Sequence, residues 1–509
     1  MMNSPKTFDG PRTWVVLFFL CLAFHFISSY FVNPQASLDA AYYHILAQRL
    51  NNGLGFTEPF IWQHLKPYTE ITRPLDYWQP LGIILYAVCQ KVFSQWGEIL
   101  GNHIIWAALS VLVFRLAFRI TEKSVVALLA YVIFGCGGKY GFYISTTDNV
   151  AFYALFGFFL LRSLMPLVQV EENDMKAIRS GAECGFLSGL MALTRVEGFF
   201  FLMLSFVTFL FRKRFRGAML LLVVFFVTIA PWVVRNQVTF GIPWNSSPKA
   251  LFLRDYDDMF EPSFDLSWNS YSRDGLSWIL QHKTASLRKN IFEFFLLPNF
   301  LFLFIFWIMG LVILWKRGIW LFLFMVIFFW FLNGALFTTQ SLKGTALHIF
   351  AAFLPHSTVV CAAGIDGFVF GIMSKFPEKV KYGFLLTIAL WAIGFTFCAI
   401  KISNENYARE LAPYEKILLK TKISPSEKIA SNFPIHVYLF SGCPGVLIPP
   451  SGAFEADKLA KKYGCRYVLL DARGHNYSIS SVTFPSWNLV ASLPPLVLWS
   501  ELPNPNPEK

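Results

Sequence analysis

Charged residues are scarce in this sequence of 509 residues, where Asp, Glu, Lys and Arg together make up only 15%. An ordinary soluble domain carries about 25%. Apolar residues make up 55% and aromatic residues 18%, with Phe alone numbering 56. The shortage of charge therefore excludes an ordinary soluble protein and predicts a chain that crosses a membrane many times.

The sequence also lacks the spacing of cysteines and histidines that holds a structural metal. Most of the eight cysteines lie singly in or beside apolar runs, where a thiol behaves as a small apolar group. Cys443 and Cys465 lie in a polar C-terminal region and can pair if that region faces an oxidising compartment. We expect no cofactor, and the sequence offers no support for a divalent metal.

The net charge of +12 is not arranged as a nucleic-acid surface. The basic residues form short clusters between apolar runs, without a basic stripe that carries interleaved aromatic residues. Such clusters are typical of the cytoplasmic loops of membrane proteins. We therefore expect a lipid bilayer, and no nucleic acid, as a partner.

Eleven apolar stretches are long enough to cross a hydrocarbon core of about 30 Å. They cover residues 13–32, 99–119, 124–143, 149–168, 181–197, 198–212, 217–235, 299–316, 318–338, 346–366 and 382–400. A twelfth stretch, 81–96, is shorter and carries Gln90 and Lys91. Whether it crosses decides the orientation of every later stretch.

If 81–96 lies along the membrane surface, the basic clusters all fall on one side, which is then the cytoplasmic side. These clusters are Lys6/Arg12, Arg115/Arg119/Lys123, Lys176/Arg179, Arg212 to Arg216, Lys316/Arg317 and Lys375/Lys379/Lys381. We therefore interpret 81–96 as a juxtamembrane or re-entrant helix of a multi-pass protein of the plasma (inner) membrane with a cytoplasmic N-terminus. Residues 33–98, 139–148, 236–298 and the region after 401 then face outward.

The predicted fold class is mainly α. A helical membrane bundle over residues 1–400, with juxtamembrane helices in the first external loop, precedes a small extracytoplasmic (periplasmic) α/β domain over 401–509. Within this last region, IHVYLF and YVLL are expected to be buried strands. FEADKLAKKYG has the pattern of a helix that ends at a glycine.

Residues 37–56, SLDAAYYHILAQRLNNGLGF, follow the first apolar stretch and predict a short amphipathic helix at the membrane interface. Ser37 is the expected N-cap, and two glycines supply the end. Asp39 then lies in the first turn, where a carboxylate also stabilises the helix dipole.

A second carboxylate, Asp148, lies at the outer end of the stretch 149–168. Alone, it is equally well explained as a helix cap. Two carboxylates at the same membrane depth make a stronger case, because ionisable groups at a membrane face usually line a cavity or a substrate path. Asp39 and Asp148 are therefore the candidate catalytic residues.

Several blocks of the sequence resemble, in order, those of the GT-C membrane glycosyltransferases. They are DAAYYHILAQRLNNGLGF, WQPLGIILYAVCQKVF, TDNVAFYALF, LTRVEGFF and APWVVRNQVTFGIPWNSS. Within that superfamily the chain is most similar to the prokaryotic protein-mannosyltransferase and aminoarabinose-transferase-like enzymes, which are related to the dolichyl-phosphate-mannose-protein mannosyltransferases. KGTALHIFAAFLPH extends the resemblance to the later apolar stretches.

The resemblance implies an inverting transferase that moves a sugar from a polyprenyl-phosphate donor to an acceptor at the outer face of the membrane. The family's catalytic base is the aspartate of the first external loop, which corresponds here to Asp39. An acidic residue of the second external loop helps to organise the site, which corresponds to Asp148. The sugar, the lipid and the acceptor (glycan, lipid or protein) are not specified.

The departing phosphate needs a cationic environment, for which Arg235, Lys343, His348 and Arg195 are candidates. Arg235 in PWVVRN has the strongest motif position, although a snorkelling anchor is the alternative. Lys343 and His348 lie in SLKGTALHIF, where the family often has a basic residue and a glycine before a span. Arg195 can instead form an internal ion pair with Glu197.

One departure from the family pattern concerns metal binding. Many relatives carry two adjacent acids at the first motif, where this chain has Leu38 and Asp39, and the single acid weakens the case for a divalent ion. Glu58 and Asp76 are further acids of the same loop that can assist. The acidic segment RDYDDMFEP is better explained as a solvated loop than as a cation site.

Two other classes stay open. A lipid transporter or flippase would be expected to carry charged groups in the middle of its spans and paired halves with broken helices, and neither feature is evident. A noncatalytic GT-C-like scaffold subunit would keep the same fold, and the sequence separates it poorly from an active enzyme.

Overall fold

The computed structural model describes residues 10–169, 174–244, 247–262, 264–296, 298, 300–450, 453–471, 473 and 487–501. Lys6 of the first basic cluster lies outside these residues. The chain forms two compact units, each assembled from three stretches. The first unit holds residues 1–34, 79–244 and 277–404, and the second holds 35–78, 245–276 and 405–509. The division near residue 400 that we expect from the sequence stays a prediction.

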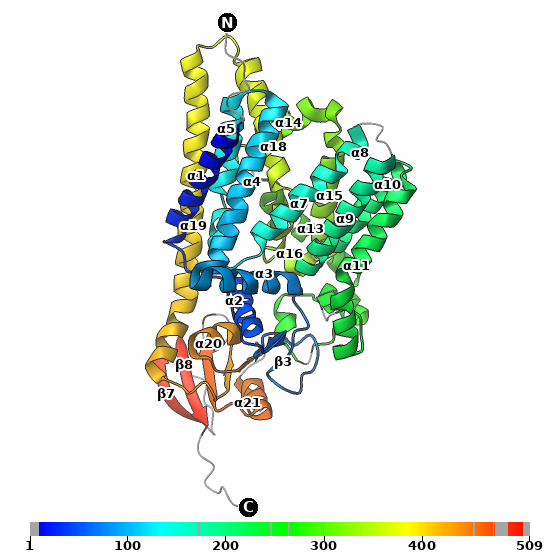
Figure 1. Cartoon of the computed structure of the whole chain (residues 1–509). Coiled ribbons are helices and arrows are strands. Elements are labelled where there is room, and N and C mark those ends of the chain that lie inside the picture. Colours follow the sequence, from blue (N-terminus) through cyan, green and yellow to red (C-terminus); the bar gives the residue numbers. More distant parts are fainter. Residues whose placement is uncertain are drawn as a thin grey trace, which may run out of the picture. The chain divides into compact units, whose positions relative to one another are not determined.

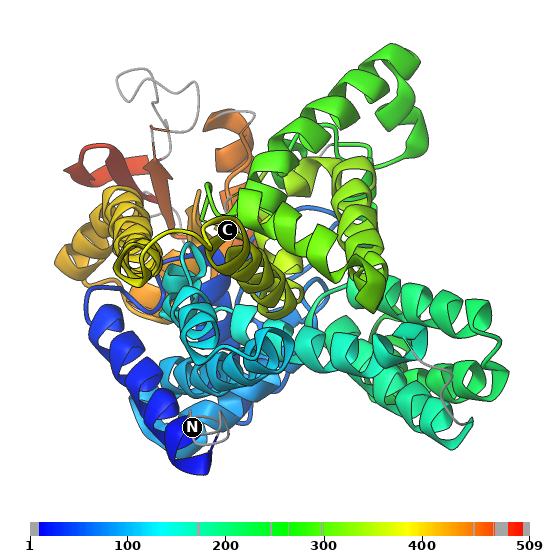
Figure 2. The same cartoon turned by 90° about the horizontal axis from the view of Figure 1, so that it is seen from above.

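The first unit is helical, and most of its long helices run roughly parallel to one another, while α3 lies across them (Figure 1). Its larger helices are α1 (Pro11–Ser29), α3 (Pro80–Phe93), α4 (Gly97–Thr121), α5 (Ser124–Cys136), α7 (Val150–Leu164), α9 (Asp174–Thr194), α10 (Gly198–Phe211), α11 (Phe215–Phe240), α13 (Gly275–Ile291), α14 (Phe304–Leu314), α15 (Ile319–Ala335) and α18 (Leu354–Asp366). Shorter helical segments are α6 (Tyr140–Ile144), α8 (Pro166–Gln169), α16 (Thr338–Ser341), α17 (Thr345–Ala351), η2 (Ser94–Trp96), η5 (Phe292–Leu296), η6 (Trp315–Arg317) and η7 (Gly367–Ile372). The view from above shows α9, α10 and α11 beside one another (Figure 2).

Every apolar stretch expected to cross the membrane contains helix. Three of them are divided between two helices: 124–143 between α5 and α6, 149–168 between α7 and α8, and 346–366 between α17 and α18. Within the described residues, five helices are long and apolar enough to span by length and composition: α1, α4, α11, the segment Leu354–Ile372 and α19 (Glu378–Thr421). Five shorter apolar helices accompany them. The chain is a multi-pass membrane protein, while its orientation and the path of 81–96 stay predictions.

At two contacts of the first unit, one made by α14 and one by α7, the packing is so close that only glycine fits. A Cβ atom added to Gly310 of α14 would lie 1.8 Å from the carbonyl oxygen of Val360 in α18. A Cβ atom on Gly157 of α7 would lie 2.4 Å from the carbonyl oxygen of Ala352. Small residues allow such close approach where packing, not the hydrophobic effect, joins helices in a membrane. The second contact fixes α7 against the segment that follows α17.

The second unit is an α/β structure, as expected for the C-terminal region. Its helical segments are α2 (Leu38–Asn51), η3 (Ser247–Phe252), η4 (Asp257–Phe260), α12 (Trp268–Ser272), α20 (Pro434–Ser441) and α21 (Ala453–Tyr463). Its strands are β1 (Thr57–Glu58), β2 (Phe60–Ile61), β3 (Arg73–Pro74), β4 (Ile429–Ser431), β5 (Gly445–Leu447), β6 (Tyr467–Asp471), β7 (Trp487–Leu493) and β8 (Leu496–Glu501). The long helix α19 begins in the first unit and ends in the second.

The described strands form one six-stranded sheet in the order β2-β5-β4-β6-β8-β7 and a separate β1-β3 pair. Pairing is parallel from β2 to β6 and antiparallel from β6 to β7. The edge strand β2 comes from the first predicted external loop, with Phe60 opposite Gly445. Ile61 and Tyr68 of that loop are also buried in the same apolar core as Val446 and Val468. The loop is therefore part of the α/β unit.

One strand expectation in the C-terminal region is wrong. IHVYLF lies in helix α20, which starts with Pro434 at its first turn and is followed by Gly442 in the left-handed conformation, with φ of 73°. A short apolar run cannot by itself distinguish a strand from a buried helix, and the flanking proline and glycine decide for the helix. YVLL does form β6, and FEADKLAKKYG forms α21 followed by Gly464 with φ of 64°.

The helix expected over 37–56 is confirmed as α2. Ser37 caps it, since its Oγ accepts a hydrogen bond of 3.1 Å from the amide of Ala40. Tyr42, Ile45 and Leu46 are buried, as the amphipathic pattern predicts. Cys443 and Cys465, whose pairing the sequence leaves open, are both free and buried thiols.

Two buried histidines make the second unit sensitive to acid. His64 Nε2 donates a hydrogen bond of 3.1 Å to the carbonyl oxygen of Leu447, and His436 is 1% exposed. Burial lowers the pKa of each to about 4, whereas an unfolded chain has histidines of pKa about 6.5. As pH falls from about 6.5 to about 4, the two histidines therefore bind protons in the unfolded chain but not in the folded unit. This difference lowers the free energy of unfolding.

We expect this acid sensitivity to lower the melting temperature of the full chain in detergent at about pH 5 relative to about pH 7. Each histidine should contribute a loss of about 2 kcal/mol at the lower pH. The variant His64→Gln/His436→Gln should melt with a smaller difference between the two pH values, whatever its stability at neutral pH. An equal difference in wild type and variant would show that other groups cause it.

Candidate functional site

In the first unit, the structure brings together two of the residues that the sequence singles out. His348 Nε2 lies 3.1 Å from Asp148 Oδ2, although the two residues are 200 positions apart in sequence. The side chains are 11% and 1% exposed, respectively. A carboxylate and an imidazole are thus held in contact inside a largely apolar unit, where ionisable groups are rare and usually functional.

The local chain explains the position of Asp148. It precedes α7, and its Oδ1 accepts a hydrogen bond of 3.2 Å from the amide of Val150. The capping role that the sequence allows is therefore present. Because Oδ2 of the same carboxylate contacts His348, capping and a second role are compatible.

His348 lies in α17, which follows Gly344, a residue with φ of 102°. Its Nδ1 lies 3.4 Å from the carbonyl oxygen of Gly344, so both ring nitrogens face oxygen acceptors. A doubly protonated imidazole satisfies both contacts, because each nitrogen then donates. Tyr143 packs its ring edge-on against the imidazole at 5.3 Å, and Tyr140 Oη donates to the carbonyl oxygen of Leu347 at 2.7 Å.

Three polar residues that the sequence analysis did not select hold the segment before α7. Tyr86 Oη donates to the carbonyl oxygen of Asp148, and Asn102 Nδ2 donates to the carbonyl oxygen of Thr146 at 2.8 Å. Glu98 Oε2 accepts from Thr147 Oγ1 at 3.0 Å. All three lie on α3 or α4 and are buried. Polar residues in or beside apolar stretches are a sequence signal for buried polar contacts, but the sequence does not show which backbone groups these side chains bind.

The other predicted cation sites have different surroundings. Arg235 is half-buried at the end of α11, where its guanidinium lies 4.6 Å from the ring centroid of Trp232 and 5.0 Å from that of Phe240. Lys343 is exposed in the turn between α16 and α17. Arg195 pairs with Glu197 at 3.1 Å, which is the internal ion pair that the sequence offers as the alternative.

In the second unit, Asp39 occupies the first turn of α2, as expected. Its charge acts on Tyr256, a residue of the acidic segment 254–262 that sequence reasoning passed over as a solvated loop. Burial, with a smaller contribution from Asp39, raises the pKa of Tyr256 to about 12. The phenol therefore stays protonated at neutral pH and can act as a hydrogen-bond donor. The predicted joint action of Asp39 and Asp148 stays a prediction.

The two further acids of the first loop have structural partners. Glu58 is fully buried, accepts a hydrogen bond from Tyr42 of α2, and pairs with Arg73 Nη2 at 2.9 Å. Asp76, also buried, pairs with Lys66. These contacts tie α2, and with it Asp39, to the β1-β3 pair.

The chain combines a bundle of apolar helices with an α/β unit, which is the fold class that the sequence predicts. Among solved structures, the chain is similar to ArnT from Cupriavidus metallidurans bound to undecaprenyl phosphate, with a TM-score of 0.53 and 13% identity over 97% of this chain and 99% of that chain. The structure of ArnT from the same organism in the apo state aligns with a TM-score of 0.53 and 12% identity, over 96% of this chain and 98% of that chain.

The archaeal oligosaccharyltransferase AglB from Archaeoglobus fulgidus, in complex with an inhibitory peptide and a dolichol-phosphate, aligns with a TM-score of 0.48 and 12% identity over 90% of this chain and 69% of that chain. No protein-family model and no curated protein sequence matches the chain. The likeness to ArnT is one of fold, and it confirms the predicted fold class.

Proposed function

We propose that the chain is a polyprenyl-phosphate-dependent glycosyltransferase that acts at the outer face of the membrane and inverts the sugar. A base removes the proton from an acceptor hydroxyl, and the acceptor oxygen forms a bond to the anomeric carbon. The bond from that carbon to the phosphate oxygen breaks, and polyprenyl phosphate leaves with the electron pair. One displacement with one base gives inversion without a covalent intermediate.

The observation that carries this proposal is the fold likeness to ArnT, which extends over 97% of this chain and 99% of that one. That ArnT structure is bound to undecaprenyl phosphate, which makes a polyprenyl phosphate the first ligand to test here. The motif blocks that resemble GT-C enzymes add support from the sequence.

Within the proposed reaction, Asp39 is the base that takes the proton from the acceptor. His348 is proposed to stabilise the charge of the phosphate as a nearby cation, with Asp148 as the positioning residue that orients its ring through the 3.1 Å contact. Arg235 and Lys343 are proposed as further phosphate contacts. For Arg195, the pairing with Glu197 makes an indirect role the better proposal.

The test is incubation of the purified full chain with a panel of polyprenyl-phosphate sugars, following release of polyprenyl phosphate. We expect wild type to turn over at least one sugar donor and His348→Ala to lose about 10²-fold in rate, because a cation held beside a developing negative charge contributes about that much. Asp148→Asn should lose less and shift the pH profile, since it keeps the shape of the side chain while weakening its hold on His348.

Lack of turnover with every donor would favour the scaffold class instead. Turnover by wild type that His348→Ala leaves unchanged would contradict the role of His348 but not the transferase. Arg288→Ala, which removes an exposed cation of the same unit, is the matched control and should keep full activity.

A further inference from the structure

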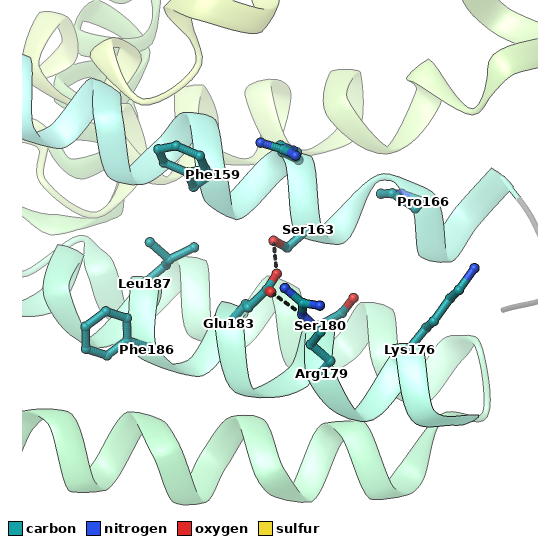
Figure 3. A pocket seen from close by; sticks show the side chains of 10 residues that line it. Phe159, Ser163, Pro166, Lys176, Arg179, Ser180, Glu183, Phe186 and Leu187 are labelled. Carbon is teal, nitrogen blue, oxygen red and sulfur yellow. Dashed lines mark hydrogen bonds and ion pairs between the residues drawn. The ribbon is translucent and has the colours of Figure 1, made fainter. Parts of the chain in front are cut away.

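A cavity of about 590 Å³ lies among the end of α7, α8 and the first half of α9 (Figure 3). Its lining combines three cationic side chains and one carboxylate with two hydroxyls and an apolar wall. The residues are Phe159, Arg162, Ser163, Pro166, Lys176, Arg179, Ser180, Glu183, Phe186 and Leu187. None of them belongs to the proposed transferase site.

The polar part of the cavity carries an excess of positive charge. Arg179 Nε donates to Glu183 Oε1 at 2.9 Å, and Ser163 Oγ donates to Glu183 Oε2 at 2.7 Å, so both carboxylate oxygens are engaged (Figure 3). The single carboxylate balances one of the three cations, which leaves the lining with a net charge of +2. Within the described part of the chain, no ion-pair partner accompanies Arg162 or Lys176. Residues 171 and 172, both glutamates, lie outside the described residues.

The apolar wall is formed by Phe159, Phe186 and Leu187. Phe186 is 50% exposed and lies in the stretch 181–197 that is expected to cross the membrane, where acyl chains of lipids are the available partners. A ligand that carries only a charge would leave this wall uncovered. A ligand with an anionic end and an apolar chain matches both parts of the cavity.

The cavity is at the opposite end of α7 from Asp148. The 14 residues from Asp148 to Arg162 correspond to about 21 Å along a helix. The basic clusters of the sequence predict that this end, with Lys176 and Arg179, faces the cytoplasm. The cavity is therefore separate from the proposed phosphate contact at His348.

We propose that this cavity binds the phosphate headgroup of an anionic phospholipid of the cytoplasmic leaflet. The phosphate oxygens accept hydrogen bonds from Arg162, Lys176 and Arg179, and the first carbons of an acyl chain cover Phe159 and Phe186. Basic pockets between helices on this side of a membrane are suited to anionic headgroups, where each nearby cation strengthens binding. The apolar wall favours a lipid over a free phosphate ion.

The test compares binding of phosphatidylglycerol and phosphatidylcholine, each with a fluorescent acyl chain, to the full chain in detergent. Wild type should prefer phosphatidylglycerol by about 10- to 100-fold, and Arg162→Gln/Lys176→Gln/Arg179→Gln should lose that preference. The matched control is Lys316→Gln/Lys375→Gln/Lys379→Gln, which removes the same charge from exposed positions of the same predicted side and should bind like wild type. Equal binding by the two triple variants would overturn the site.

Two further measurements distinguish binding of a lipid from binding of a free anion. Phe186→Ser should weaken binding of phosphatidylglycerol about tenfold or more while sparing any binding of inorganic phosphate, because only the lipid covers the apolar wall. The acyl-chain contact would be overturned if Phe186→Ser bound phosphatidylglycerol as tightly as wild type and inorganic phosphate displaced the lipid equally well from both proteins. If the triple variant fails to fold, Lys176→Glu replaces it, because Lys176 is exposed and its reversal should still lower lipid affinity.

Discussion

Replacement of Asp39 by asparagine is expected to lower the rate of sugar transfer by about 10²- to 10⁴-fold, the usual contribution of a general base. An amide has nearly the shape of a carboxylate but cannot accept the proton of the acceptor hydroxyl. Folding should be little affected, because the dipole interaction of an acid in the first turn of α2 is worth about 0.3–1 kcal/mol. The measurement is single-turnover release of polyprenyl phosphate by the purified full chain.

The matched control is Asp257→Asn, which removes an exposed carboxylate from the same unit, beside Tyr256. It should keep activity within about twofold, since an exposed acid away from the chemistry contributes little. Equal turnover by Asp39→Asn and wild type would refute Asp39 as the base while leaving the transferase itself standing. Loss of activity together with a large fall in melting temperature would show that Asp39 acts through folding.

Replacement of Arg73 by methionine is expected to destabilise the second unit by about 3–5 kcal/mol. Glu58 is fully buried, and burial raises the pKa of its carboxyl even with Arg73 present. Removing the guanidinium, which pairs with Glu58 at 2.9 Å and stacks 3.7 Å from the ring centroid of Tyr68, leaves a buried acid without its countercharge. The melting temperature of the full chain in detergent should fall by about 10 °C.

Two variants check the cause of that loss. Glu58→Gln/Arg73→Met should melt above Arg73→Met alone, because removing both charges costs less than leaving one of them buried. Arg466→Met removes a similar side chain from an exposed pair with Glu427 and should cost less than about 1 kcal/mol. A double variant that melts no higher than Arg73→Met would mean that packing against Tyr68, and not the charge of Glu58, dominates.

Short-range patterns were sufficient for much of the helical structure. The apolar stretches predicted most of the long helices of the first unit, because a segment in a membrane has to satisfy its own backbone hydrogen bonds. They did not predict α13, which lies in the expected external loop 236–298 and carries no long apolar run. Ser37 and the two glycines predicted the extent of α2, since capping and left-handed turns depend on neighbouring residues alone. IHVYLF shows the limit of this reasoning, because six apolar residues fit either a strand or a buried turn of helix.

The sequence by itself determined that this is a helical, multi-pass membrane chain and that Asp39 and Asp148 lie at helix starts. Only the tertiary structure decided that Phe60 and Ile61 of the first loop complete a sheet with β5, and that Asp148 meets His348. The physical reason is range. Helices and caps are formed by residues within a few positions of each other, whereas strand pairing and buried polar contacts join segments whose distance in sequence carries no pattern.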